Sequence, residues 1–331
     1  MVYSAEILCP AGAAAPFGPS HRSRRESTAI RQFVNYAFLA GLLLGCILLF
    51  VGGPGPSWHR FVREVWDLGH VGLFAGLAFA IGRWEMRWTP LRKIAVAIVV
   101  AAAVGLLVEV LQLFIGRDFS LFDVAYDVLG AVVGMVVASW PQLRRYPRPV
   151  VVSLCGVVAL LVAVIVAPVA AIGWDALRAQ RQFPVLAAFD STLERGRFRA
   201  VGGTGLDIGA DQMAVALTTA VYSGFFLKDA PRDWRGYRNL VVDLVNPDET
   251  PLPLVCRIHD REHTANYRSS DRFNRRFSLA PGADRLVIAL ADVEMAPRGR
   301  IMAMDQIYEF GCFVHKLEQP RRLIVRSIRL E

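Results

Sequence analysis

Five long apolar runs constrain this chain more than any other feature of its sequence. They lie at about 33–53, 66–82, 94–115, 121–139 and 149–173. Each is close to the roughly 20 residues with which a helix crosses about 30 Å of hydrocarbon, and a helix satisfies its own backbone polar groups there. With 54% hydrophobic residues in 331, the runs predict a bundle of five transmembrane helices and exclude a single soluble domain.

Positive charge is distributed unevenly between the connecting segments. Arginine and lysine gather before the first run, at 22–31, and in the loops at 83–93 and 144–148. Of the other two loops, one holds only Arg60 and Arg63, and the other holds only Arg117. Because cytoplasmic loops carry the excess of Lys and Arg, we expect the N-terminus inside and residues 175–331 outside. Anionic lipid headgroups account for the basic loops, so the net charge of +8 predicts membrane lipids, and not nucleic acid, as partners.

The composition along the chain predicts four regions. Residues 1–30 are rich in Ala, Gly, Pro, Ser and Arg without an apolar period, which is typical of a disordered tail, here cytoplasmic. Residues 31–174 hold the spans, 175–184 a linker, and 185–331 an exported domain long enough to bury a core of its own.

Strongly polar residues interrupt the apolar runs near one membrane face. They form three pairs at helical spacing and one arginine in a turn: Asp67 and His70, Glu109 and Gln112, Asp123 and Asp127, and Arg117. Residues three or four apart share a helix face. Because a charged group in hydrocarbon is costly and usually pairs inside the protein, we expect these residues to face one another in a layer below the outer surface.

The motifs around these pairs resemble the VanZ-like family of small integral membrane proteins over about residues 35–140. The resemblance rests on Asp67–His70, Val108–Phe114, Gly116–Asp118 and Phe122–Gly130 with Gly134. Two places differ from the family pattern, since Leu68 and Asp127 stand where Lys and Asn are common. The resemblance implies a multi-pass protein of the bacterial inner (cytoplasmic) membrane, with a link to glycopeptide-antibiotic (teicoplanin) resistance in some members.

Three interpretations of the polar residues remain open. They could form a structural network, with Gly130 and Gly134 as a small-residue face for close helix packing. Gln112, Arg117 and Asp127 could help to bind a lipid-linked or envelope headgroup. Asp67, His70, Glu109 and Asp123 could instead be catalytic, since a histidine beside a carboxylate can act as a general base, although no nucleophile with a matching partner is evident. We predict no cofactor and no metal.

After Trp174 the sequence changes to short alternating apolar stretches. Strands are predicted at 241–245, 254–258, 285–290 and 323–328, separated by turn signals at 246–248 and 281–283. Many strands and little helical period predict an antiparallel, all-β, jelly-roll-like sandwich. Cys256 and Cys312 share this domain, where an oxidising compartment would permit a disulfide. The sequence is equally consistent with two buried free thiols on neighbouring strands.

The order of aromatic and polar residues in this domain resembles galactose-binding-like and carbohydrate-binding jelly-roll domains over about 185–331. Trp234 and Tyr237 stand where such folds often place core aromatics. Candidate binding residues are Tyr267 and Tyr308 for stacking on sugar rings, with Asp260, Arg268 and Asp271 as polar partners.

These observations together predict a cell-envelope membrane protein that binds a glycan or a lipid-linked envelope precursor. The sandwich and the intramembrane polar residues would both contribute to this binding. The alternatives are an intramembrane enzyme acting on a lipid-linked headgroup and a structural anchor for an extracytoplasmic protein partner.

Overall fold

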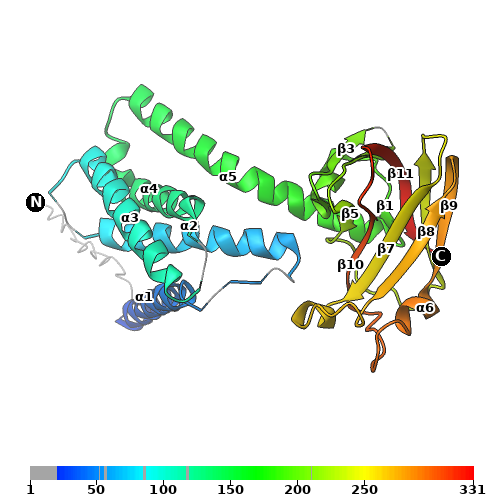
Figure 1. Cartoon of the computed structure of the whole chain (residues 1–331). Coiled ribbons are helices and arrows are strands. Elements are labelled where there is room, and N and C mark those ends of the chain that lie inside the picture. The colour runs from blue at the N-terminus through cyan, green and yellow to red at the C-terminus, as the bar shows by residue number, and fades with distance from the viewer. Residues whose placement is uncertain (1–20, 52, 56–57, 85–86, 117–118, 210) are drawn as a thin grey trace, which may run out of the picture. The chain divides into compact units, whose positions relative to one another are not determined.

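A computed structural model describes residues 21–51, 53–55, 58–84, 87–116, 119–209 and 211–331, with side chains from residue 35 onward. The chain contains a helical N-terminal region and a C-terminal β-sandwich (Figure 1). Residues 1–20 of the predicted tail lie outside the described residues, as does Arg117, whereas residues 21–30, also predicted as tail, belong to the first helix.

Five long helices make up the N-terminal region: α1 (His21–Leu48), α2 (Arg60–Gly82), α3 (Pro90–Leu113), α4 (Leu121–Leu143) and α5 (Arg148–Gln182). Among the described residues, α2 to α5 are long and apolar enough to cross a membrane. That is one span fewer than the sequence predicts, because α1 is described with side chains only from residue 35 and contributes the shorter apolar segment Asn35–Leu48. The described residues up to Val51 form a compact unit of their own.

Helix α4 lies between α2 and α3 in the bundle. Gly130 and Gly134 face the backbone carbonyl groups of Val71 and Ala75, at places where a Cβ atom would be closer than real Cβ atoms approach. The small-residue face predicted from the sequence is therefore the contact that lets α2 and α4 meet. Ser120 caps α4, because its side chain accepts a hydrogen bond from the N–H of Asp123.

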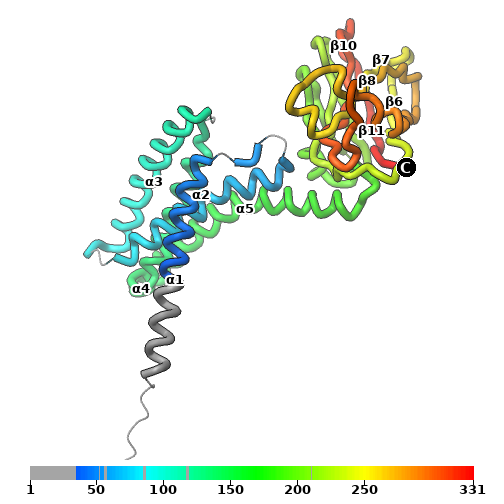
Figure 2. The backbone as a smooth tube through the Cα atoms, turned by 90° about the horizontal axis from the view of Figure 1, so that it is seen from below, coloured from blue at the N-terminus to red at the C-terminus, as the bar shows by residue number. Residues whose placement is uncertain are grey.

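Helix α5 is longer than a membrane crossing requires. Its 35 residues span about 52 Å at 1.5 Å per residue, and residues 175–182 of the predicted linker belong to it. The residues at this end of the helix, Ala176–Gln182, are all good helix formers. Figure 2 traces α5 as one continuous helix that leads directly into the sandwich.

Two antiparallel sheets form the sandwich. The first has the order β3-β4-β11-β6-β9 with β1 beside β11, and the second has the order β2-β5-β10-β7-β8. The strand bounds are β1 Val185–Ala187, β2 Phe198–Val201, β3 Gly205–Gly209, β4 Gln212–Leu217, β5 Tyr222–Leu227, β6 Asn239–Asn246, β7 Leu252–Asp260, β8 Phe273–Leu279, β9 Gly282–Ala289, β10 Ile307–His315 and β11 Arg321–Leu330. Short helices η1 (Thr192–Arg197), η2 (Glu262–Ala265) and α6 (Leu290–Glu294) join them. All four predicted strands are confirmed, as β6, β7, β9 and β11.

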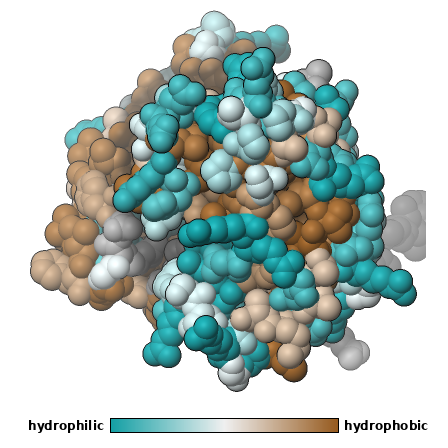
Figure 3. Space-filling view, turned by 45° about the vertical axis from the view of Figure 1, so that its right-hand side comes forward, coloured by the Kyte–Doolittle hydropathy of each residue, from teal (hydrophilic) through white to brown (hydrophobic). Residues whose placement is uncertain are grey.

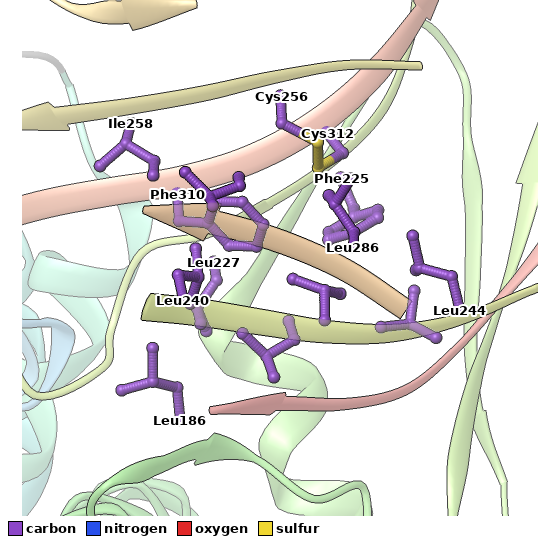
Figure 4. Close-up of a cluster of buried hydrophobic side chains, with 14 of the residues drawn as sticks. Leu186, Phe225, Leu227, Leu240, Leu244, Cys256, Ile258, Leu286, Phe310 and Cys312 are labelled. Carbon is purple, nitrogen blue, oxygen red and sulfur yellow. A yellow bond between two sulfur atoms is a disulfide. The ribbon is translucent and has the colours of Figure 1, made fainter. Parts of the chain in front are cut away.

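The core lies between the sheets, where alternate residues of each strand point inward. Figure 4 shows Leu240, Leu244 and Leu286 of the first sheet opposite residues of the second, such as Phe225. Cys256 and Cys312, directly opposite each other on β7 and β10, form a disulfide in this core. Trp234 is 2% exposed, as expected for a core residue, and its Nε1 donates to the Pro231 carbonyl at 3.0 Å.

Candidate binding site

The structure brings three of the predicted polar membrane residues into direct contact. His70 Nδ1 of α2 lies 2.9 Å from Asp127 Oδ1 of α4, and His70 Nε2 lies 3.8 Å from Asp123 Oδ2. All three side chains are buried. The imidazole therefore bridges two carboxylates one helical turn apart, as the i,i+4 spacing predicts.

The remaining residues of this layer hold helix α3 against the start of α4. Glu109 is 1% exposed, and its Oε2 accepts the backbone N–H of Ser120 at 2.6 Å. Gln112, one turn further along α3, is equally buried, whereas Asp67 on α2 is half-buried. Asp127 also packs against Gly105 of α3, where a Cβ would meet its Oδ2. These contacts link α2, α3 and α4 through one polar layer.

Among the described residues, no group of three or more His, Cys, Asp or Glu side chains is arranged to hold a metal ion. The polar layer instead contains a histidine whose ring nitrogens both face carboxylates. Such an arrangement can fix helix packing, and it can also orient an imidazole for proton transfer.

The two predicted tyrosines of the sandwich lie at the ends of a row of rings. The ring centres of Tyr308 and His259 are 5.6 Å apart, those of His259 and His263 4.6 Å, and those of His263 and Tyr267 6.0 Å. The predicted binding residues differ in exposure. Tyr267 is 73% exposed and Arg268 is exposed, whereas Tyr308 is only 9% exposed. Lys228 Nζ and the Arg232 guanidinium each lie 5.5 Å from the centre of the Tyr308 ring.

Asp260 and Asp271 lie together, and both pair with Arg300. Their contacts with that guanidinium are 2.5–2.8 Å for Asp260 and 2.6–3.0 Å for Asp271. Hydrogen bonds from Arg300 hold the pKa of Asp271 at about 2. The two carboxylates thus tie the loop after β7 to the segment before β10, with their hydrogen-bonding capacity largely used inside the protein.

A groove that the sequence did not predict crosses the outer face of the second sheet. Its volume is about 730 Å³, and the residues that line it include Arg199, Tyr222, Phe226, Arg257, Arg272 and Phe313. Ligand sites commonly measure about 300–1,000 Å³. Figure 3 shows a face of the molecule on which hydrophobic side chains lie between hydrophilic ones.

Strand register places these side chains in cross-strand rows. Arg199, Phe226, Gly311 and Arg257 are directly opposite one another on β2, β5, β10 and β7. One row along, Gly224 is opposite Phe313. Because side chains alternate between faces, all of them belong to the face opposite the core.

The two glycines of these rows give the aromatic rings their space. A Cβ on Gly311 would meet the Phe226 ring, and one on Gly224 would meet Phe313. The two rings stack with their centres 6.0 Å apart, and Tyr222 meets Phe313 edge-on at 5.6 Å. The result is an aromatic strip in which Phe226 is buried, Phe313 half-buried and Tyr222 54% exposed.

Two guanidinium groups cover the Phe226 ring. Arg199 lies 4.8 Å and Arg257 4.6 Å from its centre, and each donates to Glu309 at 2.8 Å. Burial alone would raise the pKa of Glu309, but hydrogen bonds from His259 and Arg199 and the charge of Arg199 lower it to about 2. The carboxylate is therefore ionised and fixes both arginines in place.

The family comparison agrees with the motifs in the bundle. The VanZ/LLP1 family model matches residues 17–142. This region is a VanZ-like domain. Comparison of the sequence with curated proteins finds no match. The VanZ-like resemblance predicted from the motifs is thereby confirmed.

Solved structures with similarity to the chain include carbohydrate-binding modules and glycoside hydrolases. An agarase is 16% identical over 44% of this chain, with a TM-score of 0.36. A family 11 carbohydrate-binding module from Clostridium thermocellum, in complex with a mixed-linked tetrasaccharide, is 14% identical over 44%, with a TM-score of 0.33. The chain covers 26% of the agarase and 93% of the module.

Sequence patterns contained a signal for the missed groove. In 224–227 the residues Gly224 and Phe226 alternate with the apolar residues Phe225 and Leu227. In 310–314 the residues Gly311 and Phe313 alternate with Phe310, Cys312 and Val314. This alternation is typical of a strand that carries an aromatic strip on one face and core residues on the other.

Proposed function

We propose that this membrane protein acts in the cell envelope by binding a glycan in the groove of its sandwich. The observation that carries the proposal is the aromatic strip of Tyr222 and Phe313 on an open sheet face. Flat rings of this kind offer an apolar surface on which the C–H face of a sugar ring can stack, and the guanidinium groups beside them can donate to hydroxyl groups.

The VanZ-like bundle would hold the sandwich at the membrane surface. In this proposal the protein is a multi-pass protein of the bacterial inner membrane with its N-terminus in the cytoplasm and the sandwich outside. The arginine asymmetry of the loops supports this orientation, and the disulfide of the sandwich fits an oxidising compartment. A reporter fused after residue 331 would be active only outside the cytoplasm if the orientation is right.

Binding is tested with the full chain in lipid nanodiscs and bacterial cell-wall polysaccharide as the probe. We expect Tyr222→Ala to weaken retention several-fold, because its ring is exposed and stacking would be lost. Tyr267→Ala is the matched control, since that ring is also exposed but lies outside the groove. Retention lost in Tyr267→Ala and kept in Tyr222→Ala would move the site to the loop predicted from the sequence.

A second candidate is an intramembrane enzyme, favoured by the 2.9 Å contact between His70 and Asp127. Here His70 would act as the base on a lipid-linked headgroup, with Glu109 and Asp123 in the same layer. Glu109→Gln and Asp123→Asn should then abolish function in cells while leaving abundance in the membrane intact. If abundance collapses, the layer serves helix packing.

A further inference from the structure

The charge of the groove is its least expected feature. The residues that line it include three arginines, Arg199, Arg257 and Arg272, and among the described lining residues none carries a carboxylate. The neighbouring carboxylate, Glu309, lies beneath the groove at 4% exposure and already pairs with two of the arginines. One negative charge against three positive charges leaves the groove cationic.

Arg257 and Arg272 hold donors that the protein leaves unused. The Nε–H groups of both are buried and donate to no acceptor among the described residues. Burial and the nearby charge of Arg257 lower the pKa of Arg272. An anion placed beside the exposed parts of these guanidinium groups would offset the repulsion between them.

The arginines are also held in place before any ligand arrives. Arg199 and Arg257 are each fixed by the Phe226 face on one side and Glu309 on the other. Their side chains remain 47% and 20% exposed, so a ligand can reach them. Fixed donors reduce the entropy lost on binding, and a guanidinium matches the two oxygens of a carboxylate or sulfate.

An apolar strip beside fixed cations points to a ligand with both features. Tyr222 and Phe313 offer the stacking surface, and Arg272 lines this groove as well as a neighbouring hollow of about 470 Å³. That hollow also includes Arg298, and Arg275 paired with Asp292 at 2.8 Å, so its lining remains cationic. A chain of several sugar residues would pass from the strip to these cations, whereas a small inorganic anion would leave the aromatic rings unused.

We propose that the groove selects anionic polysaccharides, whose sugar rings stack on Tyr222 and Phe313 while carboxylate or sulfate groups pair with Arg257 and Arg272. This inference rests on the proposed glycan-binding function and names its ligand class. A binder of neutral glycans would not prefer the anionic ligand, and this preference can be measured with probes that differ only in charge.

The test uses the full chain in phosphatidylcholine nanodiscs, where the lipid adds no net charge. The probes are oligogalacturonate and its methyl ester, which share one backbone and differ in the charge of the carboxyl group. We expect the acid to bind at least about tenfold more tightly than the ester, equivalent to about 1.4 kcal/mol. Arg272→Gln should remove most of that difference, because it removes one of the positive charges that line the groove. The variant should still fold, because Arg272 makes no ion pair with the described residues that would be lost.

Controls separate the possible outcomes. Arg235→Gln removes an exposed arginine that pairs with Asp233 outside the groove, and it should leave both affinities unchanged. Equal binding of acid and ester would overturn the anionic selectivity while leaving glycan binding intact, and binding of neither would count against both proposals. Competition by inorganic phosphate at the same concentration as the oligosaccharide would show a simple anion site and overturn selection of a saccharide.

Discussion

Replacing Asp175 should strongly destabilise the sandwich, because its carboxylate is the buried counterion of Arg197. Asp175 lies near the end of α5 and accepts hydrogen bonds from the Arg197 guanidinium of η1 at 2.7–3.2 Å. The two side chains are 2% and 0% exposed. Arg197 also donates to the Leu186 carbonyl at 3.2 Å, and Arg60 pairs with the same carboxylate.

The size of the effect follows from this burial. Asp175→Asn keeps the shape but leaves a buried guanidinium without its counterion, and breaking a buried pair in this way costs about 3–5 kcal/mol. With a denaturant slope of roughly 2 kcal/mol/M in urea, the midpoint of unfolding should fall by about 1.5–2.5 M. A fragment that begins at residue 185 lacks Asp175 and should be weakened in the same way.

The assay is pulse proteolysis of the full chain in nanodiscs over a urea series, following the sandwich by an antibody to its C-terminus. Asp190→Asn is the matched control, because its pair with Arg178 is 41% and 30% exposed and exposed pairs contribute about 0–1 kcal/mol. A midpoint lowered no more by Asp175→Asn than by Asp190→Asn would refute the assignment of this stability to the buried pair.

Three further predictions concern the glycine contact, pH and the disulfide. Gly134→Ala should lower abundance in the membrane because its Cβ would meet the backbone of Ala75, whereas Gly156→Ala, with open space around it, should not; equal abundance would argue against the close α2–α4 contact. Glu309 has a pKa of about 2 in the folded protein against 4.5 in the unfolded chain, so its contribution to stability is present above pH 4.5 and is lost as the pH falls towards 2. The urea midpoint of unfolding should drop over that pH window, and it should drop less in Glu309→Gln. Reduction should lower the stability of the sandwich by about 2–4 kcal/mol in the native chain but not in a Cys256→Ala, Cys312→Ala variant, and no difference between the two would contradict the disulfide.

The sequence predicted local features well because they depend on short-range periodicity. Helix spacing placed Asp123 and Asp127 on one face, and the structure shows both facing His70. Turn signals and apolar alternation placed β6, β7, β9 and β11. The extent of α5 was underestimated because its final turns are polar and carry no membrane signal, although their residues favour a helix.

The groove could not be predicted because it depends on register between distant strands. Phe226 meets Gly311 only when β5 pairs with β10 in the observed register, and a shift by one residue would turn the aromatic strip into the core. The roles of Asp260 and Asp271 depend similarly on Arg300, which is 40 and 29 residues away. Spacing along the chain holds no information on such contacts.

Photo-crosslinking tests glycan binding in the groove most directly. Cell-wall polysaccharide fragments that carry a diazirine would be irradiated with the full chain in nanodiscs, and the modified peptides would be identified by mass spectrometry. We expect crosslinks on peptides of β5 and β10 that contain Tyr222 and Phe313, reduced by Tyr222→Ala and competed by unlabelled fragments. Crosslinks confined to the loop of Tyr267, or none above the level of an unirradiated sample, would contradict glycan binding in the groove.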